Sequence, residues 1–207
     1  TALQTFSADG SQLSGSLPMA LSTLSRLQEL SIDGTNISSS IPAQYSALTA
    51  LQTFSADGSQ LSGSLPMALS TLSRLQELSI DGTNISSSIP AQYSALTALQ
   101  TFSADGSQLS GSLPMALSTL SRLQELSIDG TNISSSIPAQ YSALTALQTF
   151  SADGSQLSGS LPMALSTLSR LQELSIDGTN ISSSIPAQYS ALTALQTFSA
   201  DGSQLSG

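Results

Sequence analysis

The chain has 207 residues and a net charge of −9 at neutral pH, because thirteen acidic residues outnumber four arginines. It has no Cys, which excludes a disulfide framework and a thiolate metal site. An acidic chain without basic clusters is a poor partner for nucleic acid or for an anionic membrane surface. No apolar run approaches the roughly 18 residues that a transmembrane helix needs.

The sequence is an internal repeat, in which residues 1–48 return unchanged as 49–96, 97–144 and 145–192. Each copy divides into two related 24-residue halves, which are residues 1–24 and 25–48 in the first copy. The four full copies are followed by a fifteen-residue partial copy. A fixed period of this length is typical of a solenoid, in which each unit buries its apolar edge only against its neighbours. We therefore expect a single array over residues 1–207, without capping units.

Within a 24-residue unit the expected elements follow one another closely. Leu30, Ser31 and Ile32 alternate apolar and polar side chains, which predicts a short strand with one buried face. The Asp-Gly pair that follows predicts a turn. Pro42 cannot donate a ladder hydrogen bond, so any second strand before it should be short. The segments PAQYSAL and PMALSTL place apolar residues three apart after a proline, which suits a 3₁₀ turn.

The segment LSRLQELSIDGTNISSSIP has the apolar spacing of a leucine-rich repeat, and the chain resembles this family over its whole length. The 24-residue unit and the endings SGSLP and SSSIP are similar to the plant-specific subclass. Thr35 and Ser59 stand where that subclass usually has Asn, and this variation is more similar to the leucine-rich repeats of kinetoplastid surface antigens. The resemblance implies an α/β solenoid, a right-handed superhelix or horseshoe with a parallel β-sheet on its concave face and short 3₁₀ or irregular convex segments.

Stacking of such coils predicts which side chains form the core. Phe54 with Ala56 in one coil would face Leu30 with Ile32 in its neighbour, so that a large and a small side chain oppose two medium ones. Thr35 and its counterparts should point inward and satisfy backbone groups of adjacent coils with their hydroxyls.

The outward residues of the expected concave sheet are the candidate binding surface. No residue is singled out from its repeats as a nucleophile, acid or base, so we expect no catalytic residues and no enzyme activity. A partner would contact the sheet through Glu29, Ser31, Asp33, Thr53, Ser55, Asp57, Glu77, Asp81, Asp105 and Asp129.

An Asp recurs once in every unit just after the expected strand, from Asp9 to Asp201. Carboxylates stacked about 4.8 Å apart repel each other by roughly 0.9 kcal/mol per pair even in bulk water. One interpretation is capture of Ca²⁺ by neighbouring members such as Asp33, Asp57 and Asp81. In the simpler interpretation each Asp hydrogen-bonds the backbone of its own Asp-Gly turn, and neither a metal nor another cofactor is expected.

A second outward surface carries amides and hydroxyls. Gln60, Ser62 and Ser64 alternate with Asn36 and its neighbours along one nearly uncharged lateral face. Regular rows of this kind occur on ice-binding solenoids, although a short strand needs polar outward residues in any case. The sequon Asn-Ile-Ser makes four positions candidates for N-glycosylation in a secreted eukaryotic protein: Asn36, Asn84, Asn132 and Asn180.

These features favour a structural or adhesive leucine-rich solenoid, extracellular or at the cell surface, that binds through its concave sheet. Identical units favour a protein or a repetitive ligand, such as a polysaccharide or another copy of the chain stacked end to end. One alternative is an engineered consensus array without biological activity, and a second is an ice-binding solenoid.

Overall fold

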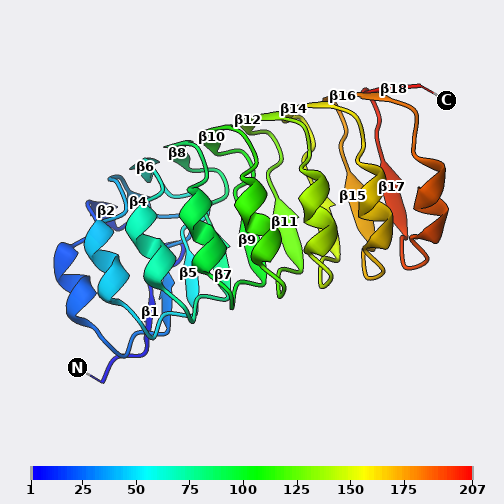
Figure 1. Cartoon of the computed structure of the whole chain (residues 1–207). Coiled ribbons are helices and arrows are strands. Elements are labelled where there is room, and N and C mark those ends of the chain that lie inside the picture. The colour runs from blue at the N-terminus through cyan, green and yellow to red at the C-terminus, as the bar shows by residue number, and fades with distance from the viewer. Residues whose placement is uncertain (1, 207) are drawn as a thin grey trace.

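The computed structural model describes residues 2–206, and it has the solenoid architecture that the repeat predicts. Each 24-residue unit is one coil that contributes a strand, a turn, a second very short strand and a 3₁₀ helix. In Figure 1 the 3₁₀ helices lie in front, the strands of the main sheet lie behind them, and the second set of strands follows the upper edge. None of the described helices is long and apolar enough to cross a membrane.

The main sheet has nine parallel strands in chain order. Paired residues occupy the same position of successive units, as in the pairing of Phe6 with Leu30 and of Leu30 with Phe54. We call the side of this sheet that faces away from the helices the concave face. The strands are β1 (Thr5–Ser7), β3 (Glu29–Ser31), β5 (Thr53–Ser55), β7 (Glu77–Ser79), β9 (Thr101–Ser103), β11 (Glu125–Ser127), β13 (Thr149–Ser151), β15 (Glu173–Ser175) and β17 (Thr197–Ser199).

A second ladder, which the sequence did not predict as a sheet, runs along the lateral edge. Its pairing is staggered, because each four-residue strand pairs through its first two residues with the preceding coil and through its last two with the following one. In β8, for example, Asn84 pairs with Ser62 and Ser86 pairs with Gln108. The ladder contains β2 (Ser14–Gly15), paired with β4 (Asn36–Ile37), and then β6 (Ser62–Gly63), β8 (Asn84–Ser87), β10 (Gln108–Gly111), β12 (Asn132–Ser135), β14 (Gln156–Gly159), β16 (Asn180–Ser183) and β18 (Gln204–Leu205).

The convex side consists of five-residue 3₁₀ helices, each preceded by an extended proline. Because proline lacks an N–H and fixes its own φ, it ends the second strand and starts the helix. The helices are η1 (Met19–Thr23), η2 (Ala43–Ala47), η3 (Met67–Thr71), η4 (Ala91–Ala95), η5 (Met115–Thr119), η6 (Ala139–Ala143), η7 (Met163–Thr167) and η8 (Ala187–Ala191).

The core is one continuous cluster between the sheet and the helices. Phe54 pairs with Leu30 on one side and Leu78 on the other, and all three are buried. Ala56 has no exposed surface, which confirms its predicted inward position next to Ile32. The expected alternation of large-plus-small with medium-plus-medium side chains is therefore present in successive coils.

The inward hydroxyls behave differently from the prediction. Thr35 is buried, but its Oγ1 donates to the carbonyl oxygen of Ile32 in the same coil at 2.8 Å. Ser59 is also buried, and its Oγ lies 3.5 Å from the backbone nitrogen of Leu61, again within one coil. The prediction that these side chains join adjacent coils was wrong. Thr35 finds its acceptor three residues back in its own turn, so its hydroxyl is used within one coil.

Candidate functional site

The register of the main sheet aligns like positions of successive coils into rows on the concave face. Thr5, Glu29, Thr53 and Glu77 lie in one row, so Thr and Glu alternate along it. We call this the Thr/Glu row. A second row, two residues further along each strand, contains only Ser. An Asp follows two residues after each of these serines, and these residues form the Asp row.

The Asp row joins each coil to the next. Oδ1 of Asp33 accepts a hydrogen bond from Ser55 Oγ at 2.7 Å and another from the backbone N–H of Asp57 at 2.8 Å. Asp9 accepts the equivalent bonds from Ser31 and from the N–H of Asp33. The pair of bonds recurs through the array at Asp57, Asp81, Asp105, Asp129, Asp153 and Asp177.

These bonds correct the interpretation in which each Asp caps its own Asp-Gly turn. The carboxylate reaches forward by one coil because the stacked strands bring the Ser and the Asp backbone of the next coil beside it. Charge-assisted bonds of this kind are stronger than neutral ones, so the row contributes to the cohesion of the stack. Within residues 2–206, no three acidic, His or Cys side chains are grouped so as to hold a metal ion, the column of Asp33, Asp57 and Asp81 included.

The same bonds decide which predicted binding residues can reach a partner. Ser31 is 5% exposed and Ser55 is 7% exposed, because each lies under the carboxylate that it contacts. Both were predicted to form part of the binding surface, and both are instead structural. Glu29 is exposed, while Thr53 and Asp57 are half-buried. The accessible part of the surface is therefore the Thr/Glu row with the outer edge of the Asp row.

Like charges on the concave face act on each other. The pKa of Glu77 is raised, first by partial burial and then by the negative charges of Asp57, Asp33, Glu125 and Glu29. Burial also raises the pKa of Asp81 and Asp129, against the opposing effect of their hydrogen bonds. At the end where the array begins, the hydrogen bond from Ser31 lowers the pKa of Asp9.

A row of amides borders the Thr/Glu row. Gln100 Nε2 donates to Gln76 Oε1 at 3.3 Å, and equivalent bonds join Gln124, Gln148 and Gln172 to the coil before them. This ladder was not predicted from the sequence, although Gln recurs at this position in both 24-residue units.

The lateral face has the polar character that the sequence predicts. Gln60, Ser62 and Ser64 are exposed on one coil, and Asn36 and Ser38 are exposed on its neighbour. All four sequon asparagines are exposed: Asn36, Asn84, Asn132 and Asn180.

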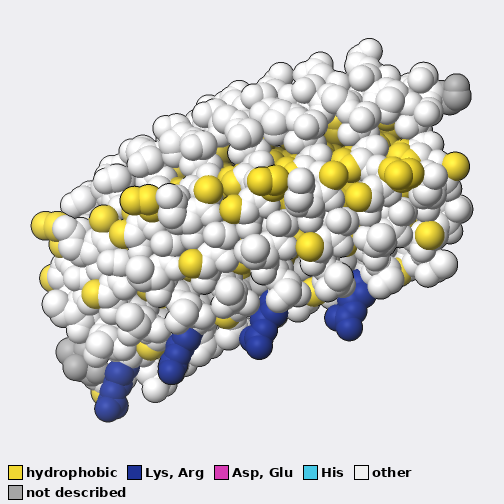
Figure 2. Space-filling model, viewed as in Figure 1, with side chains coloured by type: hydrophobic (Ala, Val, Ile, Leu, Met, Phe, Trp, Pro, Cys, Tyr) yellow, Lys and Arg dark blue, Asp and Glu magenta, His cyan; other side chains and the backbone are white. Residues whose placement is uncertain are grey.

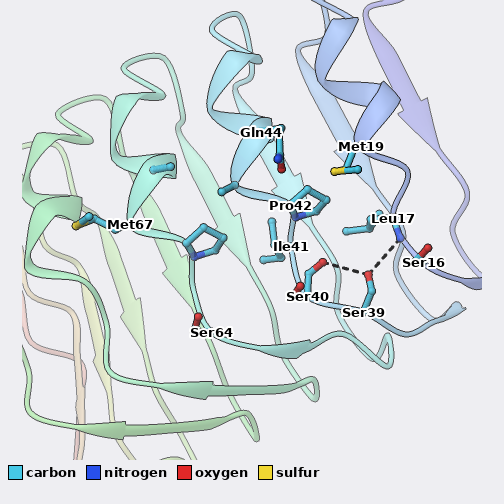
Figure 3. A pocket seen from close by; sticks show the side chains of 13 residues that line it. Ser16, Leu17, Met19, Ser39, Ser40, Ile41, Pro42, Gln44, Ser64 and Met67 are labelled. Atoms are coloured by element: carbon cyan, nitrogen blue, oxygen red, sulfur yellow. Dashed lines mark hydrogen bonds between the residues drawn. The ribbon is translucent and has the colours of Figure 1, made fainter.

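An apolar groove on the convex side was not predicted. It has a volume of about 690 Å³ and lies between η1, η2 and η3, with Met19, Pro42 and Met67 on its walls and Ile41 beneath (Figure 3). Ser39 borders it and donates to the carbonyl oxygen of Ser40 at 3.1 Å. Met19 and Met67, which begin η1 and η3, are 62% and 58% exposed. The Met that recurs at the start of every second helix is the feature of the sequence that could have indicated the groove.

Figure 2 shows the face with the 3₁₀ helices, where an apolar stripe runs along the molecule and the arginines line one edge. Acidic side chains are not visible on this face. All thirteen acidic residues belong to the two repeat positions that Glu29 and Asp33 represent. Positive and negative side chains are thus separated between the edge and the concave face.

The sequence matches the family model described as "Leucine-rich repeat region" over residues 3–156. The chain belongs to the leucine-rich repeat family. Among curated protein sequences, none matches it. Many solved structures are similar to it, among them the leucine-rich repeat ectodomain of the plant membrane receptor kinase GASSHO1/SCHENGEN3 from Arabidopsis thaliana.

A TDR receptor is 33% identical with a TM-score of 0.96, over 98% of this leucine-rich repeat chain and 35% of the receptor. The plant peptide hormone receptor RGFR1, solved in complex with RGF2, is 30% identical with a TM-score of 0.96, over 98% and 33% of the two chains. A plant ice-binding protein is 24% identical with a TM-score of 0.84, over 99% and 66%. The present chain spans about a third of the length of the receptor structures.

Proposed function

We propose that this leucine-rich repeat chain is a non-catalytic interaction module, extracellular or at the cell surface, that binds a protein partner on its concave face. The observation that carries the proposal is the separation of charge: the concave face bears every acidic side chain, while the arginines line an edge. The fold likeness to a peptide hormone receptor solved with its peptide supports a peptide or protein as partner.

Identical two-coil units favour a partner that also repeats. A surface whose side chains recur in every second coil offers the same contacts several times, so a repetitive ligand gains by multivalent binding. A polysaccharide meets this condition. A separate candidate is another copy of the chain stacked on its end, which would bind through the terminal coil. Electron microscopy at several concentrations distinguishes the last case, since coil stacking between molecules gives fibres and its absence gives discrete arcs.

The concave face is tested by selecting peptides from a random displayed library on the purified chain. The selected peptides should lose binding to the variant Thr101→Arg, which places a long cation in the Thr/Glu row. They should keep binding to Met115→Ser, which changes the convex side. Peptides that bind both variants equally well would contradict a concave site. Peptides that fail to bind only the Met115→Ser variant would place the binding site on the convex side.

Ice binding is a second candidate, and the lateral face supports it. Exposed Asn, Gln and Ser side chains recur there without any charge, at the strand spacing of about 4.8 Å. The plant ice-binding protein shares the fold. Ice-recrystallisation inhibition by the purified chain, with Ser86→Lys and Ser134→Lys together as the variant, tests this proposal. Inhibition that the two lysines abolish would support it, and absence of inhibition by the unchanged chain would exclude it.

A further inference from the structure

The Thr/Glu row has a repeat length that a ligand can match. Glu29, Thr53 and Glu77 lie side by side in register, so a Glu recurs at every second strand. With strands about 4.8 Å apart, successive Glu positions are about 9.6 Å apart. The Glu residues of this row are Glu29, Glu77, Glu125 and Glu173.

A polyproline II helix has nearly the same repeat. It advances about 3.1 Å per residue with three residues per turn, so the same side of the helix returns after about 9.3 Å. A β-strand also covers a similar distance in three residues, but its side chains alternate, so every third residue does not face the same side. Across the three intervals between the four Glu residues, the accumulated mismatch of the polyproline helix is about 0.9 Å, well within the reach of a long side chain.

We infer that the concave face binds an extended cationic peptide in polyproline II conformation, with Arg or Lys at every third position, lying across the strands along the Thr/Glu row. This inference rests on the proposed function and names the class of partner. Each basic side chain would contact one Glu, and the two intervening residues would lie over Thr53 and its counterparts, whose short side chains leave room between the carboxylates.

The charge of the surface selects a cation. Partial burial is the main cause of the raised pKa of Glu77, and the negative charges of its neighbours, Glu29 and Glu125 among them, raise it further. A bound cation relieves this repulsion. The Asp row adds to this field, because each Oδ1 is held by the next coil and keeps its carboxylate on the concave side. A metal ion is a poorer match to this surface than a peptide, because the described residues contain no group of three acidic ligands around one point.

The test compares three synthetic peptides with equal numbers of arginines, in which Arg alternates with one, two or three prolines. Fluorescence anisotropy at low ionic strength measures their affinity for the chain. The peptide with two prolines between arginines should bind at least about tenfold more tightly than the other two, because only its charges match the Glu spacing. Equal affinity of the three peptides would overturn the inference.

A pair of multiple variants locates the effect. Gln in place of all four Glu should abolish the preference for the matched peptide and leave a weak, spacing-independent attraction to the Asp row. The control places Gln at Arg26, Arg74, Arg122 and Arg170 and should keep the preference, because these arginines lie along the edge seen in Figure 2. A preference that survives the Glu variant would overturn the inference.

The library selection separates failure of this inference from failure of the proposed function. In one outcome, library peptides require the concave face while the three arginine peptides bind equally well. This result would refute a ligand with a basic residue at every third position and would still support a peptide site on the concave face. Absence of any concave binder would refute both.

Discussion

Oδ1 of Asp105 lies 2.7 Å from Oγ of Ser127, a residue of the next coil, and 2.7 Å from the backbone nitrogen of Asp129. One carboxylate oxygen thus fixes both a side chain and the main chain of its neighbour. Repulsion between stacked carboxylates should weaken the Asp row, yet this row joins the coils. Each carboxylate accepts two hydrogen bonds from the next coil, and these offset the cost of its partial burial.

Replacing Asp105 by Ala should lower the free energy of unfolding by about 1–3 kcal/mol, because Ser127 and the N–H of Asp129 lose their acceptor in a half-buried position. Urea denaturation measures the change. The control Glu125→Gln removes a carboxylate from the same face and should change stability by less than about 0.5 kcal/mol. Equal losses of stability in the two variants would contradict the assignment of the loss to these hydrogen bonds.

Stability should rise when the pH is lowered from neutral towards 4.5, the ordinary pKa of a Glu such as Glu77. The pKa values of Glu77, Asp81 and Asp129 are raised in the folded chain, so the folded state binds these protons more tightly than the unfolded state, and acidification through this range stabilises it. Asp9 has a lowered pKa and acts in the opposite sense, losing its contribution only as the pH falls below its ordinary value of 3.8. Melting temperatures across this range measure the balance, and a steady fall on acidification would contradict it.

Ala56→Phe should lower the free energy of unfolding by roughly 1–3 kcal/mol, because Ala56 is fully buried and an added ring overpacks the core. Ala91→Phe serves as the control, since Ala91 is exposed at the start of η4. An unchanged melting temperature of the Ala56 variant would show that the core can expand at this position.

The lateral ladder has a glycine with positive φ at one position of every second coil. Gly111 has φ of 80°, and a Cβ there would lie 3.1 Å from the Cβ of Ser88. We expect Gly111→Ala to cost about 1–3 kcal/mol. Ser87, the equivalent residue of the preceding coil, has φ of 97°, so Ser87→Gly should relieve strain and leave stability unchanged or higher. Chemical denaturation of both variants measures the changes, and an equal loss of stability in the two would contradict the assignment of strain to Ser87.

Secretion from a eukaryotic host should add N-linked glycans at the exposed asparagines Asn36, Asn84, Asn132 and Asn180. Intact mass measures the occupancy, and digestion with an N-glycosidase should return the mass of the bare chain. Asn84→Gln should remove one glycan without changing the fold, because the backbone N–H of Asn84, and not its side chain, bonds the neighbouring coil through Leu61. A mass without glycan would exclude modification in that host.

The local pattern was sufficient to predict the strand, the core and the 3₁₀ turn. Leu30, Ile32 and Phe54 are buried as their spacing indicates, since alternation along a strand and stacking at a fixed period leave one inward face. The outward position of Asn36 follows from the same alternation.

The candidate site was predicted less completely. Ser31 and Asp33 were both predicted as contact residues, yet Ser31 is covered by Asp9, and Asp33 in turn binds Ser55. The convex groove beside Met19 was not predicted, because it arises between coils and not within one.

The period, the inward side chains and the placement of every acidic residue on one face follow from the amino-acid sequence, because alternation along a strand and repetition at a fixed period leave one inward face. The hydrogen-bond partner of each polar group depends on the contacts between coils. Oδ1 of Asp33 turns to the next coil, and Thr35 turns back to its own, because the 24-residue register brings the hydroxyl of Ser55 and the backbone of Asp57 within hydrogen-bonding distance of one carboxylate.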